Sequence, residues 1–119
     1  MLLRLLGILG RVIKMKQYKV QITDKALADM EEVYNYIAYV LQSPENALAQ
    51  YSRIAEAIEG LAIFPERNRI IEISVKGNME LRNQHVDNYS AFYVVEDDKV
   101  IVVRVLYSAS DIEKRLREK

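Results

Sequence analysis

Residues 80–107, ELRNQHVDNYSAFYVVEDDKVIVVRVLY, decide the fold of this chain. Two polar turns, Asp87-Asn88 and Glu96 to Lys99, divide the stretch into three segments that are rich in Val, Ile, Tyr and Phe. Branched and aromatic side chains fit a pleated, half-buried surface, and short polar turns favour hairpins. The last segment, Val100 to Leu106, is almost uninterrupted apolar sequence, which is typical of a central strand covered on both faces. We therefore expect three antiparallel strands, with the rest of the chain covering them.

A strand and a helix are expected before this stretch. Lys16 to Thr23 alternates apolar and polar residues, which indicates a strand with one buried face. Thr23 or Asp24 is expected to cap a helix that extends to about Leu41. Asp29, like the other polar residues of this helix, falls outside its apolar stripe. The residues of the stripe are Ala26, Leu27, Met30, Val33, Tyr34, Ile37, Val40 and Leu41.

A second helix is expected to pack antiparallel to the first. Ser43-Pro44 combines a preferred N-cap residue with proline at the first helical position. Phe64-Pro65 ends this helix after about Ile63. Because the link between the two helices is so short, they form a helical hairpin. The residues expected on its buried side are Ala47, Leu48, Tyr51, Ile54, Ala55, Ile58, Leu61 and Ala62.

The remaining segments complete an α+β domain. Arg69 to Val75 indicates a strand, Lys76 to Asn78 a turn, and Ile112 to about Arg117 a short helix capped by Ser110 or Asp111. The expected architecture is an N-terminal strand, a helical hairpin packed on a mainly antiparallel sheet of about four to five strands, and a short C-terminal helix.

Residues 1–15, MLLRLLGILGRVIKM, are expected to form an amphipathic N-terminal extension, and residues 16–119 the domain itself. The extension is too short and too charged to span a bilayer, and arginines interrupt its apolar run, which disfavours a signal peptide. A membrane-surface helix, a partner-binding or dimerising helix and a simple upstream extension are all compatible with it.

Composition sets further bounds on function. A length of 119 residues fits one domain. The absence of cysteine excludes disulfides, zinc–thiolate sites and thiol nucleophiles, and fits a reducing cytoplasm. A formal net charge of zero does not indicate a nucleic-acid binder. The charge is uneven, because residues 24–66 carry eight acids against Lys25 and Arg53, a net charge of −6.

The sequence lacks the residue groups of several common active sites. Its one histidine, His85, cannot build a zinc site without help from carboxylates, and no clustered ligand motif accompanies it. Four scattered glycines exclude a phosphate-cradling loop and a dinucleotide fingerprint. No nucleophile elbow surrounds any serine. We therefore expect neither a metal nor a cofactor.

Tyrosines and basic residues of the sheet are the candidates for ligand contacts. Tyr89 and Tyr107 stand at strand ends, where a hydroxyl can face a ligand, whereas Tyr34, Tyr51 and Tyr93 fall on core stripes. With these two tyrosines, five bases could form a positive face for RNA or an acidic peptide: Arg67, Arg69, Lys76, Arg82 and Arg104. Arg104 interrupts an apolar strand, so its charge must be paired or functional.

An ordered set of short motifs runs through the chain from Tyr18 to Asp111. It comprises Y-K-V-x-I-T, E-x-x-x-Y-I, S-P-E-N-A, L-x-x-F-P, L-R-x-x-x-V-x-N-Y-x-x-F-Y-x-V and V-x-V-x-R-V-L-Y-S-x-x-D. In this order the motifs resemble the RelE/ParE superfamily of toxins from bacterial type II toxin–antitoxin modules, also known as plasmid stabilisation system proteins. The resemblance covers nearly the whole chain after Met15.

The resemblance implies a small cytoplasmic toxin that a cognate antitoxin holds inactive by wrapping it with a helix or an extended segment. A homodimer, or a heterotetramer with the antitoxin, is compatible with it, and no membrane partner is implied. RelE-like members are mRNA interferases that cleave mRNA on the ribosome without a metal, using arginine and lysine charges. ParE-like members inhibit DNA gyrase and are not known as enzymes.

The residues favour the ParE-like branch. RelE-like proteins carry a base directly after the tyrosine of the penultimate strand, where this chain has Ser90 after Tyr89. They also carry bases after the last strand, where this chain has residues 108–110, Ser-Ala-Ser. Losing one preorganised charge of this kind typically costs ~3 kcal/mol, or ~100-fold in rate. A C-terminal His-Tyr pair, used by another RNase branch, is missing, and the long hairpin favours the ParE side.

We therefore expect a growth-inhibiting toxin that binds DNA gyrase, and we favour a binding protein over an enzyme. The candidate binding residues are Arg82, Tyr89, Arg104, Tyr107, Arg67 and Arg69. Two alternatives stay open. In a ribosome-dependent mRNA endonuclease, Arg82 would stabilise phosphate, with His85 or Tyr107 as acid or base. In a degenerate toxin that binds its antitoxin without activity, the serines at 90 and 110 would account for the missing chemistry.

Overall fold

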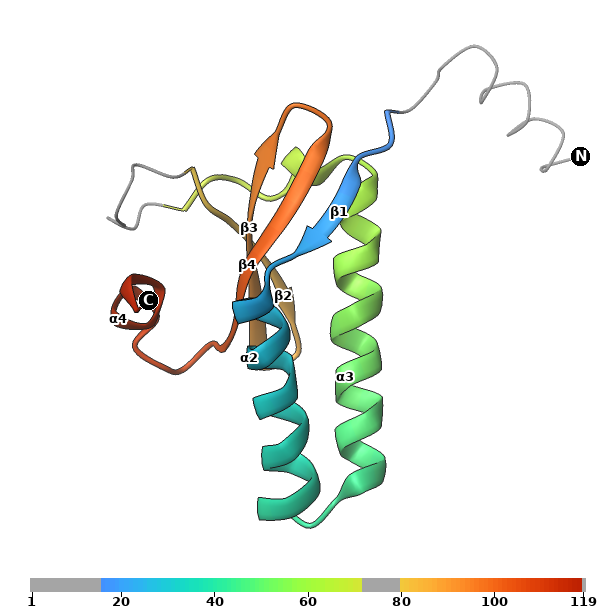
Figure 1. The fold of residues 1–119 in the computed structure, drawn as a ribbon, viewed down its shortest axis with the longest axis vertical. Helices are drawn as coiled ribbons and strands as arrows, with labels where there is room; N and C mark the ends of the chain where they lie inside the picture. Colours follow the sequence, from blue (N-terminus) through green and yellow to red (C-terminus); the bar gives the residue numbers. More distant parts are fainter. Residues whose placement is uncertain (1–15, 72–79, 119) are drawn as a thin grey trace, which may run out of the picture.

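A computed structural model describes residues 16–71 and 80–118 of the chain (Figure 1). A four-stranded sheet has the order β1-β4-β3-β2. The strands are β1 (Lys19–Ile22), β2 (Arg82–Val86), β3 (Tyr89–Glu96) and β4 (Lys99–Tyr107). β1 runs parallel to β4, and the other neighbours are antiparallel. The expected α+β class and the central position of the last strand are therefore confirmed.

Helices flank this sheet in the expected order. They are α2 (Asp24–Asn35), a π-helical turn η1 (Tyr36–Val40), α3 (Pro44–Glu59), the 3-10 turns η2 (Gly60–Ala62) and η3 (Pro65–Arg67), and α4 (Ile112–Arg117). α2 and α3 form the helical hairpin, and its closed end extends past the ends of β3 and β4 (Figure 1). The division at residue 15 stays a prediction, because residues 1–15 lie outside the described part.

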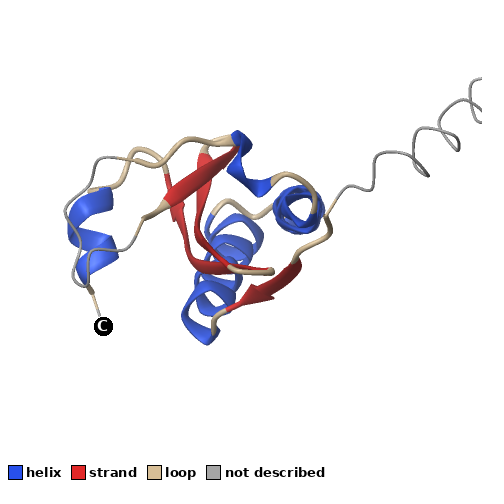
Figure 2. Ribbon diagram, turned by 90° about the horizontal axis from the view of Figure 1, so that it is seen from above, coloured by secondary structure: helices blue, strands red, loops and turns tan. Residues whose placement is uncertain are grey.

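The two faces of the sheet have separate apolar cores. The hairpin packs on one face, where Tyr93, Val102 and Val105 meet Met30, Ile54 and other helix residues. On the other face α4 packs near the smaller cluster of Leu81, Phe92, Val94 and Leu106 (Figure 2). Adjacent residues such as Phe92 and Tyr93 belong to different clusters because successive side chains of a strand point to opposite faces.

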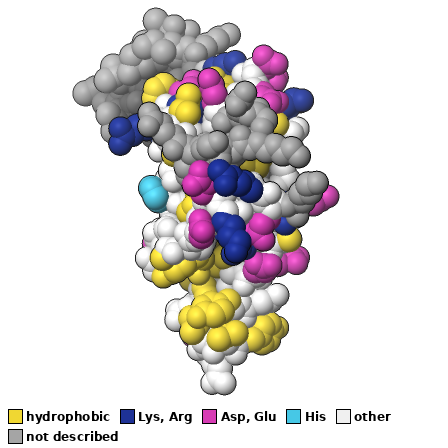
Figure 3. All heavy atoms as spheres, turned by 90° about the vertical axis from the view of Figure 1, so that its left-hand side faces the viewer, with side chains coloured by type: hydrophobic (Ala, Val, Ile, Leu, Met, Phe, Trp, Pro, Cys, Tyr) yellow, Lys and Arg dark blue, Asp and Glu magenta, His cyan; other side chains and the backbone are white. Residues whose placement is uncertain are grey.

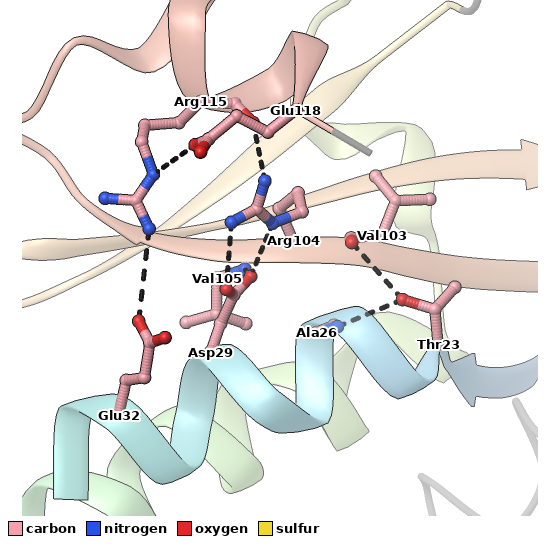
Figure 4. Close-up of polar contacts among 9 residues, drawn as sticks. All are labelled: Thr23, Ala26, Asp29, Glu32, Val103, Arg104, Val105, Arg115 and Glu118. Carbon is pink, nitrogen blue, oxygen red and sulfur yellow. Dashed lines mark hydrogen bonds and ion pairs between the residues drawn. The ribbon is translucent and has the colours of Figure 1, made fainter. Parts of the chain in front are cut away.

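The first helix also completes one edge of β4. β1 ends opposite Val102, so the backbone groups of β4 beyond it have no strand partner on that side. The Thr23 hydroxyl donates to the Val103 carbonyl (3.2 Å) and accepts from the Ala26 N–H (3.1 Å) as the N-cap of α2. The Val105 N–H donates to Oδ2 of Asp29 (2.9 Å). Side chains of α2 therefore replace the missing strand (Figure 4).

Several sequence predictions about the helices are wrong. Asp29 is buried, because its carboxylate serves the edge of β4. By contrast, the predicted start of the second helix is confirmed, with Ser43 at the N-cap and Pro44 directly after it, although the Ser43 side chain makes no capping bond. Four residues predicted on the buried stripes are exposed, namely Leu27, Val40, Leu41 and Leu48. One reason is that the end of the hairpin lies beyond the sheet (Figure 1). Another is the π-turn, in which the Leu41 N–H bonds to the Tyr36 carbonyl five residues back, so the side chains that follow no longer keep the α-helical spacing.

The strand predicted at residues 69–75 is only partly described. Ile70 forms an isolated bridge with Arg82, and no named strand includes it. The rest of that prediction, with the turn at residues 76–78, lies outside the described residues. The acidic turn at residues 96–99 is exposed, as predicted, and Asp97 has a positive φ of 51°.

Candidate protein-binding site at the hairpin end

Tyr89 and Tyr107 stand opposite each other where β3 and β4 meet the helical hairpin. Their ring centroids lie 5.7 Å apart in an edge-to-face arrangement. Burial, together with the nearby hydroxyls of Tyr107 and Tyr36, raises the pKa of Tyr89 above its ordinary value. The structure thus brings together the two tyrosines that the sequence placed at strand ends. Tyr89 packs on the face of the sheet that the first helix covers.

A cavity of about 540 Å³ lies beside this tyrosine pair. It is lined by Asp29, Glu32, Val33, Tyr36, Leu41, Asn88, Tyr89, Val105, Leu106, Tyr107 and Arg115. Its walls therefore come from α2, the π-turn and the residue after it, the β2–β3 turn, the start of β3, the end of β4 and α4. Its size and its mixture of aromatic and aliphatic walls with a few polar groups are typical of binding sites.

Apolar side chains surround the cavity and continue over the hairpin end. The exposed fractions are 52% for Tyr36, 73% for Tyr39, 65% for Val40 and 56% for Leu41. Seen from the α4 side, hydrophobic side chains gather toward the hairpin end, below a cluster of acidic and basic side chains (Figure 3). We call the four residues 36, 39, 40 and 41, with the cavity beside them, the hairpin-end surface.

Asp29, which lines the cavity, belongs to a buried ion pair with Arg104. Nε and Nη2 of Arg104 donate to Oδ2 and Oδ1 of Asp29, at 2.7 and 3.0 Å, and both residues are at least 94% buried. Nη1 of Arg104 donates to the Arg115 carbonyl of α4 (2.5 Å). The Asp29 carboxylate raises the pKa of Arg104 above its ordinary value, despite the opposing effect of burial. Arg104 is therefore paired, and it joins α2, β4 and α4 (Figure 4).

Arg115 extends this charged group toward solvent. Its guanidinium lies 2.7 Å from the Glu118 carboxylate and 4.0 Å from that of Glu32 on α2. These pairs are partly exposed and contribute little to stability. Arg115 and Glu32 both line the cavity, and Glu118 lies next to Arg115 (Figure 4).

Arg67 and Arg82 lie elsewhere, against the segment that follows the second helix. Nη1 of Arg82 donates to the carbonyls of Glu66 (3.2 Å) and Asn68 (2.5 Å). Nη1 of Arg67 donates to the carbonyls of Gly60 and Ile63, at the end of the helical segment. Its Nη2 donates to the side-chain oxygen of Gln84. Both guanidiniums hold backbone carbonyls, so the structure gives each an internal role beside the predicted contact with a ligand.

The remaining candidates are dispersed. Arg69 is exposed and makes no hydrogen bond or ion pair within the described part of the chain. His85 is exposed on β2, and its Nδ1 lies 3.1 Å from the hydroxyl of Ser90. Ser90 is only 2% exposed and also contacts the Ser108 hydroxyl (3.1 Å). A base at position 90 would need space that this packed serine does not have. Lys76 lies outside the described residues.

Sequence reasoning missed most residues of the site, among them Asp29, Tyr36 and Leu41. The signal for the latter two was present, because residues 36–41, YIAYVL, are apolar without a break. Such a run is wider than one buried stripe and indicates a helix end with apolar groups on more than one side. No local signal marks Asp29, whose burial follows from the short β1.

Two features are absent from the described part of the chain. Within residues 16–71 and 80–118, no group of three or more His, Asp or Glu side chains is placed to hold a metal ion. Among the helices of this described part, none is long and apolar enough to cross a membrane.

Comparison with protein families identifies the chain. Residues 20–112 match the model for the ParE toxin of the type II toxin–antitoxin system parDE. The chain belongs to the ParE toxin family. No curated protein sequence matches it.

Solved structures share the fold of this ParE-family chain. A structure of the chromosomal ParDE toxin–antitoxin system from P. aeruginosa is similar with a TM-score of 0.64 at 24% identity, covering 76% of this chain and 96% of that one. The RelBE2 toxin–antitoxin complex from Mycobacterium tuberculosis gives 0.55 at 20% identity, covering 82% and 98%. The archaeal RelE–RelB complex from Pyrococcus horikoshii gives 0.52 at 17%, covering 78% and 97%. At these identities the likeness concerns the fold.

Proposed function

We propose that this ParE-family chain arrests bacterial growth in the cytoplasm by binding DNA gyrase, and that a cognate antitoxin neutralises it. The observation that carries the proposal is the family match over residues 20–112, which includes the hairpin and, apart from the first residue of β1, the four strands. The exposed hairpin-end surface supports a protein-binding mode of action, because soluble proteins seldom expose adjoining apolar side chains without a partner.

The arrangement of cations supports binding rather than phosphodiester cleavage. Cleavage without a metal needs cationic groups directed at the place where charge develops on the phosphate. Here Arg104 is buried against Asp29, and Arg82 donates to backbone carbonyls. The position after Tyr89, where RelE-like proteins carry a base, holds the buried Ser90. The two candidates for acid or base are His85 and Tyr107, and both are exposed. We propose no catalytic role for them.

The test is a short induction of the full chain in a bacterium without the antitoxin. Growth, plasmid supercoiling and the 5′ ends of cellular mRNA are followed in the same culture. We expect growth arrest, loss of negative supercoiling and no new mRNA ends inside codons. Purified chain added to gyrase should inhibit supercoiling of relaxed plasmid directly.

The other outcomes distinguish the alternatives. New ends inside codons, abolished by His85→Ala, would replace the gyrase proposal with ribosome-dependent mRNA cleavage. Normal growth with a partner still bound would indicate a degenerate toxin. Normal growth with no partner would refute toxin function altogether.

A further inference from the structure

A second cavity lies between the two helices of the hairpin, which run side by side (Figure 1). Its volume is about 430 Å³, and it shares no described residue with the cavity at the hairpin end. Because side chains three and four positions apart lie on one face of a helix, each helix presents one group of residues to it. α2 contributes Glu31, Tyr34 and Asn35, and α3 contributes Leu48 and Tyr51. We call it the interhelix cavity.

Two tyrosine rings at right angles form a corner of this cavity. The ring centroids of Tyr34 and Tyr51 lie 6.4 Å apart, and the ring planes make an angle of 87°. Both side chains are half-buried and pack against the main core, which holds them in place. The face of an aromatic ring carries partial negative charge and attracts cations, most strongly where water is excluded. A compact cation in such a corner can contact both rings.

A carboxylate without a partner adds negative charge to the interhelix cavity. Glu31 is exposed, and it forms no hydrogen bond or ion pair with any residue that the structure describes. From residue 26 to residue 52 the chain has no Lys or Arg. The next base along α3, Arg53, is paired with Asp87 at 2.7 Å. A negative cavity beside aromatic rings favours a cationic ligand over an anionic or neutral one.

The walls of the interhelix cavity also select the kind of cation. Leu48 and the tyrosine rings offer mainly apolar surface. A primary ammonium group is strongly hydrated and has three N–H donors, each of which costs free energy when it loses water without gaining an acceptor. A quaternary ammonium group has no N–H donor, and its methyl groups pack well on aromatic and aliphatic surfaces. These walls therefore suit a methylated ammonium better than a primary amine or a hydrated metal ion.

We infer that the interhelix cavity binds a trimethylammonium group. The cation lies in the corner between Tyr34 and Tyr51, Glu31 supplies the counter-charge, and Leu48 covers the methyl groups. This site goes beyond the proposed function. Neither gyrase nor an antitoxin takes part in its test, so the result of that test does not depend on the proposed function.

The test is a titration of the full chain with choline, followed by heteronuclear NMR. The reference ligand is 3,3-dimethylbutan-1-ol, a neutral molecule of the same shape in which carbon replaces the charged nitrogen. If the positive charge is recognised, choline should bind at least about fivefold more tightly than this alcohol. The largest shift changes should fall on the backbone amides of residues 31–35 and 48–51, which surround the cavity.

Variants with matched controls separate the charge from the aromatic walls. Glu31→Gln removes the counter-charge at an exposed position and should raise Kd roughly threefold. Its control is Glu59→Gln, which removes an exposed acid at the far end of α3. Tyr34→Leu removes one ring and should raise Kd roughly fivefold or more. Its control is Tyr39→Leu, at an exposed tyrosine outside the cavity. Both controls should stay within about twofold of the wild-type Kd.

A sedimentation assay identifies the source of the trimethylammonium group. If the chain sediments with phosphatidylcholine vesicles but not with phosphatidylglycerol vesicles, the group belongs to a lipid headgroup. If it binds choline and sediments with neither, the group belongs to a free solute. Both results support the inference.

Four outcomes would overturn the inference. The first is a titration without saturable shift changes, and the second is equal affinity for choline and the neutral alcohol. The third is a set of shift changes away from the interhelix cavity. The fourth is a Glu31 variant that binds choline as well as its control does. Because Glu31 is exposed, its replacement leaves the core intact, so this variant decides the test even if Tyr34→Leu does not fold.

Discussion

Replacing Asp29 by alanine should destabilise this protein more than the loss of any exposed ion pair. Three hydrogen bonds converge on its carboxylate, from Nε and Nη2 of Arg104 and from the Val105 N–H. Alanine leaves a guanidinium in a buried site without its counter-charge and an edge N–H without its acceptor. Both losses arise in the folded state, because in the unfolded chain water solvates these groups.

The magnitude follows from the burial of both partners. Breaking a buried ion pair by removing one member typically costs about 3–5 kcal/mol, because the other charge stays desolvated. For a domain of this size, about 4 °C in Tm accompanies each kcal/mol, so we expect Tm to fall by roughly 12–20 °C. The orphaned N–H belongs to the same network, so its cost is not added separately.

Urea unfolding followed by far-UV circular dichroism measures the effect. The control is Glu113→Ala, which breaks an exposed ion pair with Arg117 (3.1 Å) and should cost only about 0.3–0.5 kcal/mol. The double variant Asp29→Leu with Arg104→Met removes both charges and should recover most of the loss, since apolar replacements of buried pairs are often neutral. The reasoning would be refuted if Asp29→Ala lowered the free energy of unfolding by less than about 1 kcal/mol. It would also be refuted if the double variant lost as much stability as the single variants Asp29→Leu and Arg104→Met together.

Three further predictions concern titration and a buried hydroxyl. Hydrogen bonds from Arg53 and Gln50 lower the pKa of Asp87 below 3.8. The ionised Asp87 carboxylate therefore stabilises the fold above about pH 4, and this stabilisation is lost as the pH falls through the folded-state pKa. The urea midpoints of Asp87→Asn and of the wild type should converge in acid. Because the pKa of Tyr89 is raised, its hydroxyl stays protonated to a higher pH in the folded state than in the unfolded chain. The free energy of unfolding should therefore fall as the pH rises above 10, and it should fall less in Tyr89→Phe. The Tyr93 hydroxyl donates to a backbone carbonyl at 2.6 Å, so Tyr93→Phe should cost about 1–2 kcal/mol in urea unfolding, and an unchanged midpoint would contradict this.

Local sequence patterns were sufficient for most of the fold. The turns at Asp87-Asn88 and at residues 96–99, the helix start at Thr23 and the apolar run of β4 all depend on neighbours in the chain. Such patterns report backbone preference and one buried face directly. The pairing of Arg104 was also foreseeable, since an unpaired charge cannot persist in a central strand.

The candidate site depended on contacts that are distant in sequence. Asp29 meets Arg104 across 75 positions, and nothing within α2 distinguishes it from the exposed acids beside it. Arg67 and Arg82 appear as free cations in the sequence, yet backbone carbonyls of residues 60–68 occupy them. The sequence has no means to say which donors are already engaged, because that depends on how loops fold back on the sheet.

By itself the sequence determined the order of strands and helices, the hairpin, the mainly antiparallel sheet and the family, because these follow from local periodicity and from motifs in a fixed order. Only the tertiary structure decided what lies beyond the sheet. β1 stops at Ile22, so α2 takes over the edge of β4 and Asp29 is buried there. The hairpin extends past the strands, so Tyr36 and Leu41 stay exposed beside Tyr89 and Tyr107. A side chain is buried or exposed according to the element that covers it, and that coverage is a property of the packed molecule.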